Sequence, residues 1–396
     1  MKLRLTFNKN TVFFLVVTLA MAAMVWYGLN SSIDYRPINM DGIAFVPGKV
    51  LEIVSEDTEI DSNGLHRGRQ DLSVKLLSGI RKGDVIDVVN TLSVDHNVYV
   101  RKGSRIIVYL DQQPGDEYYY ATVQSFERQW AIIAVVALIL CLLAAVGGRT
   151  GIRSAFGLIF TFVVVFSLLI PLIIKGAPPV PLALGLVLCI IVISLISILG
   201  FTKKTVVSIL GTGSGVVICC IFFLILSRVL HITGYNVENI DPLVLIAQNT
   251  NIKVGGFLFV GILVASLGAV MDVSVSVASS MAELSETNPK ATFKSLLSSG
   301  VKIGRDIVGA TLNTLIMAFT GASLIMLIMF RIYNYQTELL INHNEIGIEI
   351  LQAAASSSAL ILCAPITAFV AARMYAGKSA GKPGKSAGKP SRKRKR

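Results

Sequence analysis

The sequence has little charge, few histidines and few cysteines. Only 15% of its 396 residues are Asp, Glu, Lys or Arg. The four histidines are far apart, and no Cys or His residues have the spacing of a zinc site. All five cysteines fall inside apolar stretches, where they pack as small apolar side chains. We therefore expect neither a zinc site nor disulfide bonds.

A nucleotide-binding loop is also missing. The glycine-rich GTGSG, residues 211–215, lies inside an apolar stretch and lacks the Lys-Ser/Thr pair of a phosphate-binding loop. Small residues in apolar helices allow close helix packing, which is the role we assign to it. The net charge of +12 does not indicate nucleic-acid binding, because nine Lys and Arg residues lie in 377–396, where there is no acid. We expect no cofactor and no nucleic-acid partner.

Apolar residues are what the sequence has in abundance. They make up 53% of the chain, and the mean hydropathy of +0.68 exceeds what a soluble core needs. About 20 apolar residues in a helix cross the roughly 30 Å core of a bilayer. The apolar runs lack the alternation of membrane β-strands, so they should be helices. We predict an α-helical integral membrane protein with about eight transmembrane helices, near residues 11–29, 130–147, 154–174, 180–200, 206–227, 254–282, 307–330 and 348–372.

The distribution of Lys and Arg predicts the orientation of these helices. If the first helix starts in the cytoplasm, the inward loops and ends hold twelve basic residues. The short outward loops then hold only Lys175, Arg228, Lys253 and Arg331. Cytoplasmic loops are enriched in basic residues. We therefore expect a multi-pass protein of the plasma membrane with both termini in the cytoplasm.

This topology divides the rest of the chain into three predicted segments. Residues 1–29 form either an N-terminal membrane anchor helix or a signal peptide, and the length of the apolar run favours the anchor. Residues 129–375 form a seven-helix membrane domain. Residues 376–396 form a disordered basic cytoplasmic tail, because they cannot bury apolar area. That tail either fixes the topology or binds anionic lipid headgroups.

Residues 30–128, expected outside the cytoplasm, are the only segment long enough for a soluble domain. They contain 15 acids and 11 bases, and short β-branched runs alternate with turn signals. Glycine turns precede two runs, in RKGDVIDV and RKGSRIIVYL, as in compact barrels. We predict a small all-β domain, an OB-like or SH3-like barrel. The acid-rich EIVSEDTEID, residues 52–61, could attract cations, but we expect a solvated loop.

Two consecutive predicted helices each carry one polar face. The first has polar residues at i, i+4, i+7 and i+11, which share one side of a helix: Asp272, Ser276, Ser279 and Glu283. The next has polar residues every seven positions: Ser299, Asp306, Asn313 and Thr320. Between them, SETNP offers Asn288 as the N-cap of the second helix and Pro289 in its first turn.

Asp272 is the least expected of these residues in a membrane span. An aspartate at a helix centre costs about 2.5–3.5 kcal/mol on insertion scales, so the polar faces must meet each other or a water-filled cavity. Arg305 and Lys302 are expected at a matching depth, as partners for Asp272. An ionisable residue in a span indicates function by default. The alternative is structural: Asp306 stabilises a helix start, and Ser and Asn join helices.

A resemblance to a known family rests on these residues. Residues 268–324 contain GAVMDVSVSVASSMAEL, then NP, SGVKIGRDIVGATLNTL and FTGASL, a combination that resembles the YibE/F family of multi-pass bacterial membrane proteins. The family's motif positions correspond here to Gly268, Met271, Asp272, Gly304, Arg305, Asp306, Asn313 and Thr314. Family members often have G-T-M before N-T, whereas this chain has Ala310, Thr311 and Leu312, a conservative departure. The topology agrees over residues 1–375, and the resemblance implies a transport function.

The sequence thus predicts a membrane transporter or permease for an ion or small polar solute, rather than an enzyme. A proton or cation would load on Asp272 and Asp306, while Arg305 would balance charge or meet an anionic substrate. Because the chain lacks a nucleotide-binding loop, an ion gradient or a separate ATPase subunit would drive transport. The chain could also associate as a homo-oligomer.

Two other functions are compatible with the same residues. An intramembrane aspartyl hydrolase would use the two aspartates, although Arg305 favours the charged form of its neighbour and such a dyad needs one protonated member. A scaffold or sensor would bind a partner through the outer β domain.

Overall fold

The structure is a computed structural model that describes residues 9–31, 42–79, 81–112, 118–237, 240–248 and 250–376. The predicted tail at 376–396 lies almost wholly outside these ranges. The chain forms two compact units. One comprises residues 34–145, and the other comprises the described residues on either side of that segment. Each unit has its own hydrophobic core.

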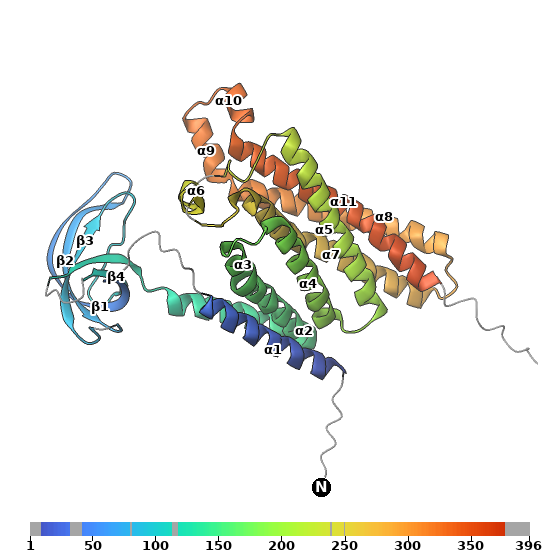
Figure 1. The fold of residues 1–396 in the computed structure, drawn as a ribbon, viewed down its shortest axis with the longest axis horizontal. Helices are drawn as coiled ribbons and strands as arrows, with labels where there is room; N and C mark the ends of the chain where they lie inside the picture. The colour runs from blue at the N-terminus through green and yellow to red at the C-terminus, as the bar shows by residue number, and fades with distance from the viewer. Residues whose placement is uncertain are drawn as a thin grey trace, which may run out of the picture. The chain divides into compact units, whose positions relative to one another are not determined.

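Five strands in the first unit form a closed barrel (Figure 1). They are β1 (Ile43–Ile60), β2 (His66–Leu76), β3 (Val85–Leu92), β4 (Arg105–Asp111) and β5 (Tyr120–Phe126). The order β1-β2-β3-β5-β4 places β5 between β3 and β4, and only the β3–β5 pair is parallel. The prediction of a small all-β barrel is confirmed.

Alternation along the strands builds the barrel core. On β2, Leu72, Val74 and Leu76 point inward at a spacing of two and are at most 1% exposed. Two polar side chains, Gln70 and Asn90, are also buried, and they bond to each other: the Asn90 amide donates to Gln70 Oε1 at 3.0 Å. The same amide donates to the Val98 carbonyl at 2.8 Å. Such bonds offset the cost of removing polar groups from water.

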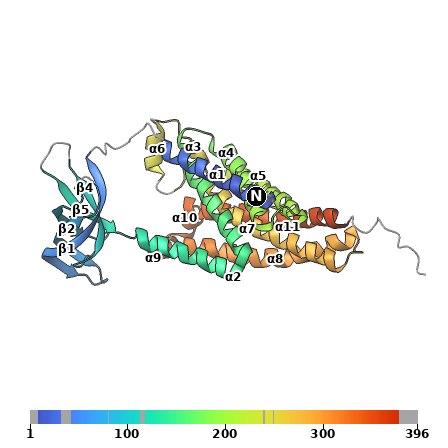
Figure 2. The ribbon, with the colours of Figure 1, turned by 90° about the horizontal axis from the view of Figure 1, so that it is seen from below.

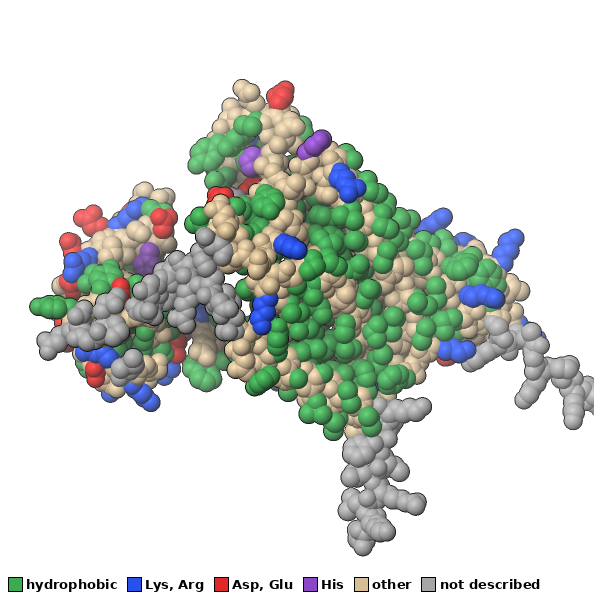
Figure 3. Space-filling view, in the orientation of Figure 1, with side chains coloured by type: hydrophobic (Ala, Val, Ile, Leu, Met, Phe, Trp, Pro, Cys, Tyr) green, Lys and Arg blue, Asp and Glu red, His purple; other side chains and the backbone are tan. Residues whose placement is uncertain are grey.

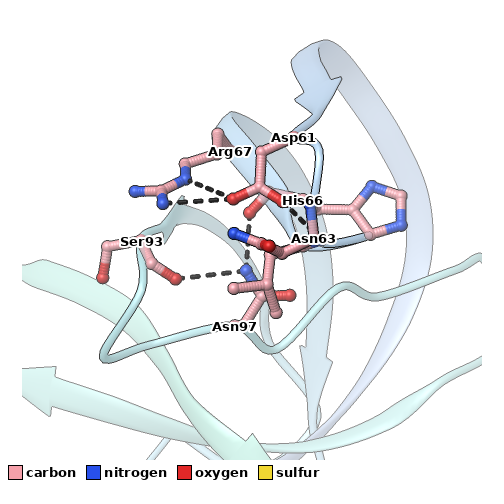
Figure 4. Close-up of polar contacts among 7 residues, drawn as sticks. Asp61, Asn63, His66, Arg67, Ser93 and Asn97 are labelled. Atoms are coloured by element: carbon pink, nitrogen blue, oxygen red, sulfur yellow. Dashed lines mark hydrogen bonds and ion pairs between the residues drawn. The ribbon is translucent and has the colours of Figure 1, made fainter. Parts of the chain in front are cut away.

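The acid-rich segment 52–61 is not a loop, so that prediction was wrong. Residues 52–60 form the second half of β1, and residues 55–60 pair with the start of β2. Asp61 then closes the turn: its carboxylate accepts hydrogen bonds from the backbone N–H groups of Asn63 and Leu65 and forms an ion pair with Arg67 (Figure 4). These contacts hold the pKa of Asp61 below its usual value; the hydrogen bond from the Leu65 backbone N–H has the largest effect, and those from Asn63 and Arg67 have smaller ones. The segment was misread because its charges, which favour a loop, lie on a two-stranded ribbon that is exposed on both faces.

The second unit is helical. Its elements, counting α2 as shared with the barrel unit, are α1 (Lys9–Asn30), α2 (Gln129–Val164), the π-helix η1 (Val165–Leu169), α3 (Ile170–Ile174), α4 (Pro179–Leu199), α5 (Lys203–Val229), α6 (Asp241–Gln248), the 3-10 helix η2 (Val254–Gly256), α7 (Phe257–Thr287), α8 (Phe293–Ala322), α9 (Leu324–Ile332), α10 (Thr337–Ile341) and α11 (Asn344–Tyr375). Helix α1 packs against η1, with the ring of Phe14 5.1 Å from that of Phe156 on α2.

Within the described residues, six helical segments are long and apolar enough to cross a membrane. A seventh is formed by α8 and α9 together, which are bent by 53°. The segment from Gln129 to Ile174 has 46 residues, about 70 Å if straight, so it is long enough for two crossings. Gly148 interrupts it with a non-helical backbone (φ 53°, ψ −132°), between the predicted stretches 130–147 and 154–174. Each of the eight predicted stretches therefore falls on helix.

Helix α8 starts later than the sequence suggested. Asn288 is the C-cap of α7 rather than the N-cap of the next helix, and residues 288–291 form a turn. Thr292 is the N-cap, with its hydroxyl accepting from the backbone N–H of Ser295 at 3.3 Å. The prediction for Asn288 and Pro289 was wrong because a Thr with a free hydroxyl lies four residues further on and caps equally well.

Helices α5, α7 and α11 pack against one another at the centre of the helical unit (Figures 1 and 2). Gly211 lies against Thr367, and Gly215 lies against Val270 and Cys363, so closely that neither position has room for a Cβ atom. Across the same contact, Ser274 Oγ and Cys363 Sγ are 2.8 Å apart. The assignment of GTGSG to helix packing is confirmed. All five cysteines are free thiols.

The outer surface of this unit is apolar over much of its area. Over α4 and α5, the face in Figure 3 is largely hydrophobic, with Lys and Arg side chains near its ends. On α5, Val206, Leu210, Val217 and Ile221 are all more than 40% exposed. Exposed apolar patches of this extent mark a surface that is covered by lipid or by another protein.

The two core glycines of α5 can be tested against a neighbour that has room. We expect Gly215→Ala to destabilise the protein by about 1–3 kcal/mol, because its methyl group would overlap Val270 and Cys363. Gly213→Ala is the matched control: its nearest contact is Leu188 at 3.8 Å, and Ala favours helix by up to about 1 kcal/mol. Thermal unfolding in detergent measures both. Equal effects of the two variants would contradict the packing role.

The barrel should fold without the helical unit. A fragment of residues 30–128 is expected to give a β-rich circular dichroism spectrum, because the core of the barrel is complete within it. In that fragment Leu72→Ala, at a site 1% exposed, should lower the free energy of unfolding by about 2–5 kcal/mol. Val54→Ala, at a site 66% exposed, should change it by less than about 0.5 kcal/mol. A disordered fragment would refute this.

Candidate functional site

Helix α7 has one buried and one exposed side. Val270, Val273 and Val277 are fully buried at the spacing that faces α5 and α11. The predicted polar residues lie on the other side: Asp272, Ser276 and Glu283 are exposed, and Ser279 is half-buried. The polar face therefore lies outside the packed core, and the core does not depend on it.

Small residues continue this exposed side toward the start of α7. Gly261, Ala265 and Gly268 precede Asp272 by eleven, seven and four positions, so they share its side of the helix, and all three are exposed. Apart from the neighbouring backbone of α7 itself, no atom would lie within 4 Å of a Cβ at Gly261 or Gly268. The helix thus presents a smooth strip that ends in ionisable residues, and a second surface can approach its backbone closely.

Helix α8 is exposed along most of its length. Only Leu296, Gly300 and Gly304 are buried. The predicted polar residues and their basic neighbours lie elsewhere on it: Lys302, Arg305, Asp306, Asn313 and Thr320 are exposed, and Ser299 is half-buried. The polar face of α8, like that of α7, lies outside the helix contacts.

The contact between α7 and α8 uses small and apolar residues. A Cβ on Gly300 would meet the Met281 side chain, and one on Gly304 would lie 3.1 Å from Ala364 on α11 and 3.8 Å from Val277. Counting from these contacts along the two antiparallel helices places Asp272 level with Gly309. The polar faces are therefore not buried against each other.

No ion pair between Asp272 and either Arg305 or Lys302 occurs in the structure. The ion pairs among the described residues all lie in the barrel: Arg67–Asp61, Arg69–Asp71, Arg81–Asp84 and Arg105–Glu127. Asp272, Lys302 and Arg305 are instead each exposed. Among the residues that the structure describes, no group of three or more His, Cys, Asp or Glu side chains could hold a metal ion.

A residue that the sequence reasoning missed lies at the far end of α8. Glu349 on α11 lines two adjoining cavities, of about 560 Å³ and about 190 Å³. Thr320, the last residue of the predicted polar face, lines the smaller cavity with it. Ser323, at the bend between α8 and α9, lines both. The signal was the pair Glu345 and Glu349, one turn apart where the last apolar stretch begins, but the sequence alone does not place this pair beside Thr320.

The structure defines a mostly helical protein whose helices are compatible with a membrane, joined to a five-stranded barrel. A family model described as YibE/F-like protein matches residues 135–377, which is more than half of the chain. The chain belongs to the YibE/F-like family, as its motifs indicated. The match includes every candidate residue on α7, α8 and α11, whereas all five barrel strands lie before it. No curated protein and no solved structure matches the chain.

The exposure of Asp272 makes its contribution to stability testable. We expect Asp272→Asn to change the free energy of unfolding by less than about 0.5 kcal/mol, because no ion pair is lost. Val273→Asn, one residue on and fully buried, should cost at least about 1–3 kcal/mol through an unsatisfied amide. Thermal unfolding in detergent compares them. A loss of about 3–5 kcal/mol in Asp272→Asn, restored by Arg305→Gln, would show a buried ion pair instead.

Proposed function

We propose that this chain is a multi-pass membrane protein that transports an ion or a small polar solute along the polar faces of α7 and α8. Its apolar helices cross the bilayer with both ends in the cytoplasm and the barrel outside. The excess of basic residues in the loops assigned to the cytoplasm supports this orientation. The apolar exposed surface of α5 supports contact with lipid.

One observation carries the proposal: α7 and α8 present ionisable side chains on the sides that the packed core leaves open. Exposed to hydrocarbon, Asp272 alone would cost about 2.5–3.5 kcal/mol. Such residues in membrane proteins face a water-filled path or a partner. The strip of Gly261, Ala265 and Gly268 admits a close neighbour. A second copy of the chain, or a separate subunit, therefore closes the path against lipid.

Asp272 and Asp306 load the transported proton or cation in this proposal. Both carboxylates are exposed, so water and ions reach them, and neither is held in an ion pair within the described chain. Arg305, next to Asp306, balances the charge of an empty site. Ser276, Ser279, Asn313 and Thr320 supply hydroxyl and amide ligands along the same path.

The flux experiment uses purified protein in liposomes that contain a pH-sensitive dye. We expect proton influx above that of protein-free liposomes, and a loss of about tenfold or more in Asp272→Asn and Asp306→Asn, since an amide keeps the shape but cannot change charge. Glu338→Gln is the control: it removes an exposed acid of α10, which belongs to neither polar face.

Three results would overturn the proposal. The first is Asp272→Asn protein with full flux. The second is wild-type protein that carries no protons, Na⁺ or K⁺ above background. The third is peptide cleavage without flux, which would assign the aspartates to hydrolysis.

The water-filled path can be tested separately from flux. In a variant without native cysteines, Ser276→Cys should react with a membrane-impermeant thiol reagent, because the reactive thiolate forms only where water is present. Leu210→Cys, 51% exposed on the apolar side of α5, should not react in membranes but should react in detergent. If both positions react alike in membranes, the polar face is no more hydrated than the lipid-facing one.

A further inference from the structure

The larger cavity lies where the end of α8, α9 and the start of α11 meet. Its volume of about 560 Å³ is within the range of pockets that bind small molecules. It is lined by residues from both sides of the 53° bend between α8 and α9. None of its described lining residues is Lys or Arg, whereas Glu345 and Glu349 both line it. The described lining therefore offers a carboxylate, that of Glu349, as a ligand for a cation.

Aromatic rings form another part of the wall. Phe330 is buried, and its ring lies 5.1 Å from that of Tyr335 and 4.7 Å from that of His343, in edge contacts. These contacts hold the rings in place. Tyr333 and Tyr335 are 68% and 39% exposed, so they have surface available to a ligand. Aromatic faces attract cations, and ring clusters are the usual sites for quaternary ammonium groups.

Glu349 is the acidic group best placed to hold such a ligand. It is half-buried on α11, and among the described residues its carboxylate has no hydrogen bond or ion pair. It lines the larger cavity and also the smaller one of about 190 Å³. The rest of the smaller cavity is mainly apolar, with Ile316, Phe319 and Ile350 beside Thr320. A carboxylate, exposed tyrosine rings and apolar side chains together match a cation with an apolar body.

We propose that this cavity binds an organic cation, such as a quaternary or protonated amine, with Glu349 as its counter-ion and Tyr333 and Tyr335 as its aromatic wall. The inference rests on the proposed transport function, for which it names the substrate class. The smaller cavity, which shares Ser323 and Glu349 with this one, is also lined by Thr320 of the polar face of α8, so the larger cavity is the outer entrance of the path. Inorganic ions need no aromatic wall, and anions would be repelled by the Glu349 carboxylate.

The test measures binding, not flux, on the full chain in detergent. Radiolabelled choline is the probe, and 3,3-dimethyl-1-butanol is its uncharged isostere. We expect saturable choline binding that the isostere does not displace, weakened about tenfold or more in Glu349→Gln and severalfold in Tyr335→Leu. Tyr335→Phe should keep most of the binding, since it keeps the ring. Glu338→Gln, which removes an exposed acid of α10 outside the cavity, is the control.

The possible results separate this inference from the proposed function. Choline bound equally well by Glu349→Gln, displaced by the uncharged isostere, or not bound saturably at all would overturn the cation site. Transport by Asp272 and Asp306 would stand in each case if their variants lose flux. Conversely, choline binding that depends on Glu349, without any flux, would support the site and overturn transport. Folding of each variant is checked by thermal unfolding, and Tyr335→Phe controls for loss of packing.

Discussion

Close contact between α5, α7 and α11 is the constraint on which the arrangement of the helical unit depends. The backbones approach at Gly211 and Gly215, where Thr367, Val270 and Cys363 occupy the space that a side chain would need. The inner side of α7 is used entirely in this contact. Asp272 and Ser276 lie on the opposite side of the helix, so they remain outside this contact. The exposure of the polar face is thus a result of the packing.

The barrel does not share this dependence. Its core is built from its own residues, and its buried polar side chains, Gln70 and Asn90, bond to each other, with Asn90 also donating to the Val98 carbonyl. The family match likewise covers the helical part and not the strands. The chain therefore joins a helical unit with the family's motifs to a barrel that has its own source of stability.

Hydrophobic runs and alternation were enough to predict the helices and the barrel, because both patterns follow from the period of the element. The polar face of α7 could be predicted from the spacing of Asp272, Ser276 and Glu283 for the same reason. The surroundings of this polar face could not be predicted from the sequence, because Gly300 and Gly304, rather than the charged residues, determine how α8 lies against α7. Glu349 was missed because it meets Thr320 through the fold, from a helix that is distant in sequence. The acidic half of β1 was misread because charge density suggests a loop, whereas backbone pairing with β2 is not visible in composition.

That half of β1 has a consequence for how the protein behaves in solution. Residues 55–60 pair with β2 on one side, while β4 pairs only with residues 43–49, so within the described chain the other edge of the ribbon is open. An open edge offers unpaired backbone groups to any other strand and is a starting point for aggregation. Glu56, Asp57 and Glu59 lie exposed along it. Two such ribbons would bring like charges together, so these acids disfavour edge-to-edge pairing between copies of the barrel.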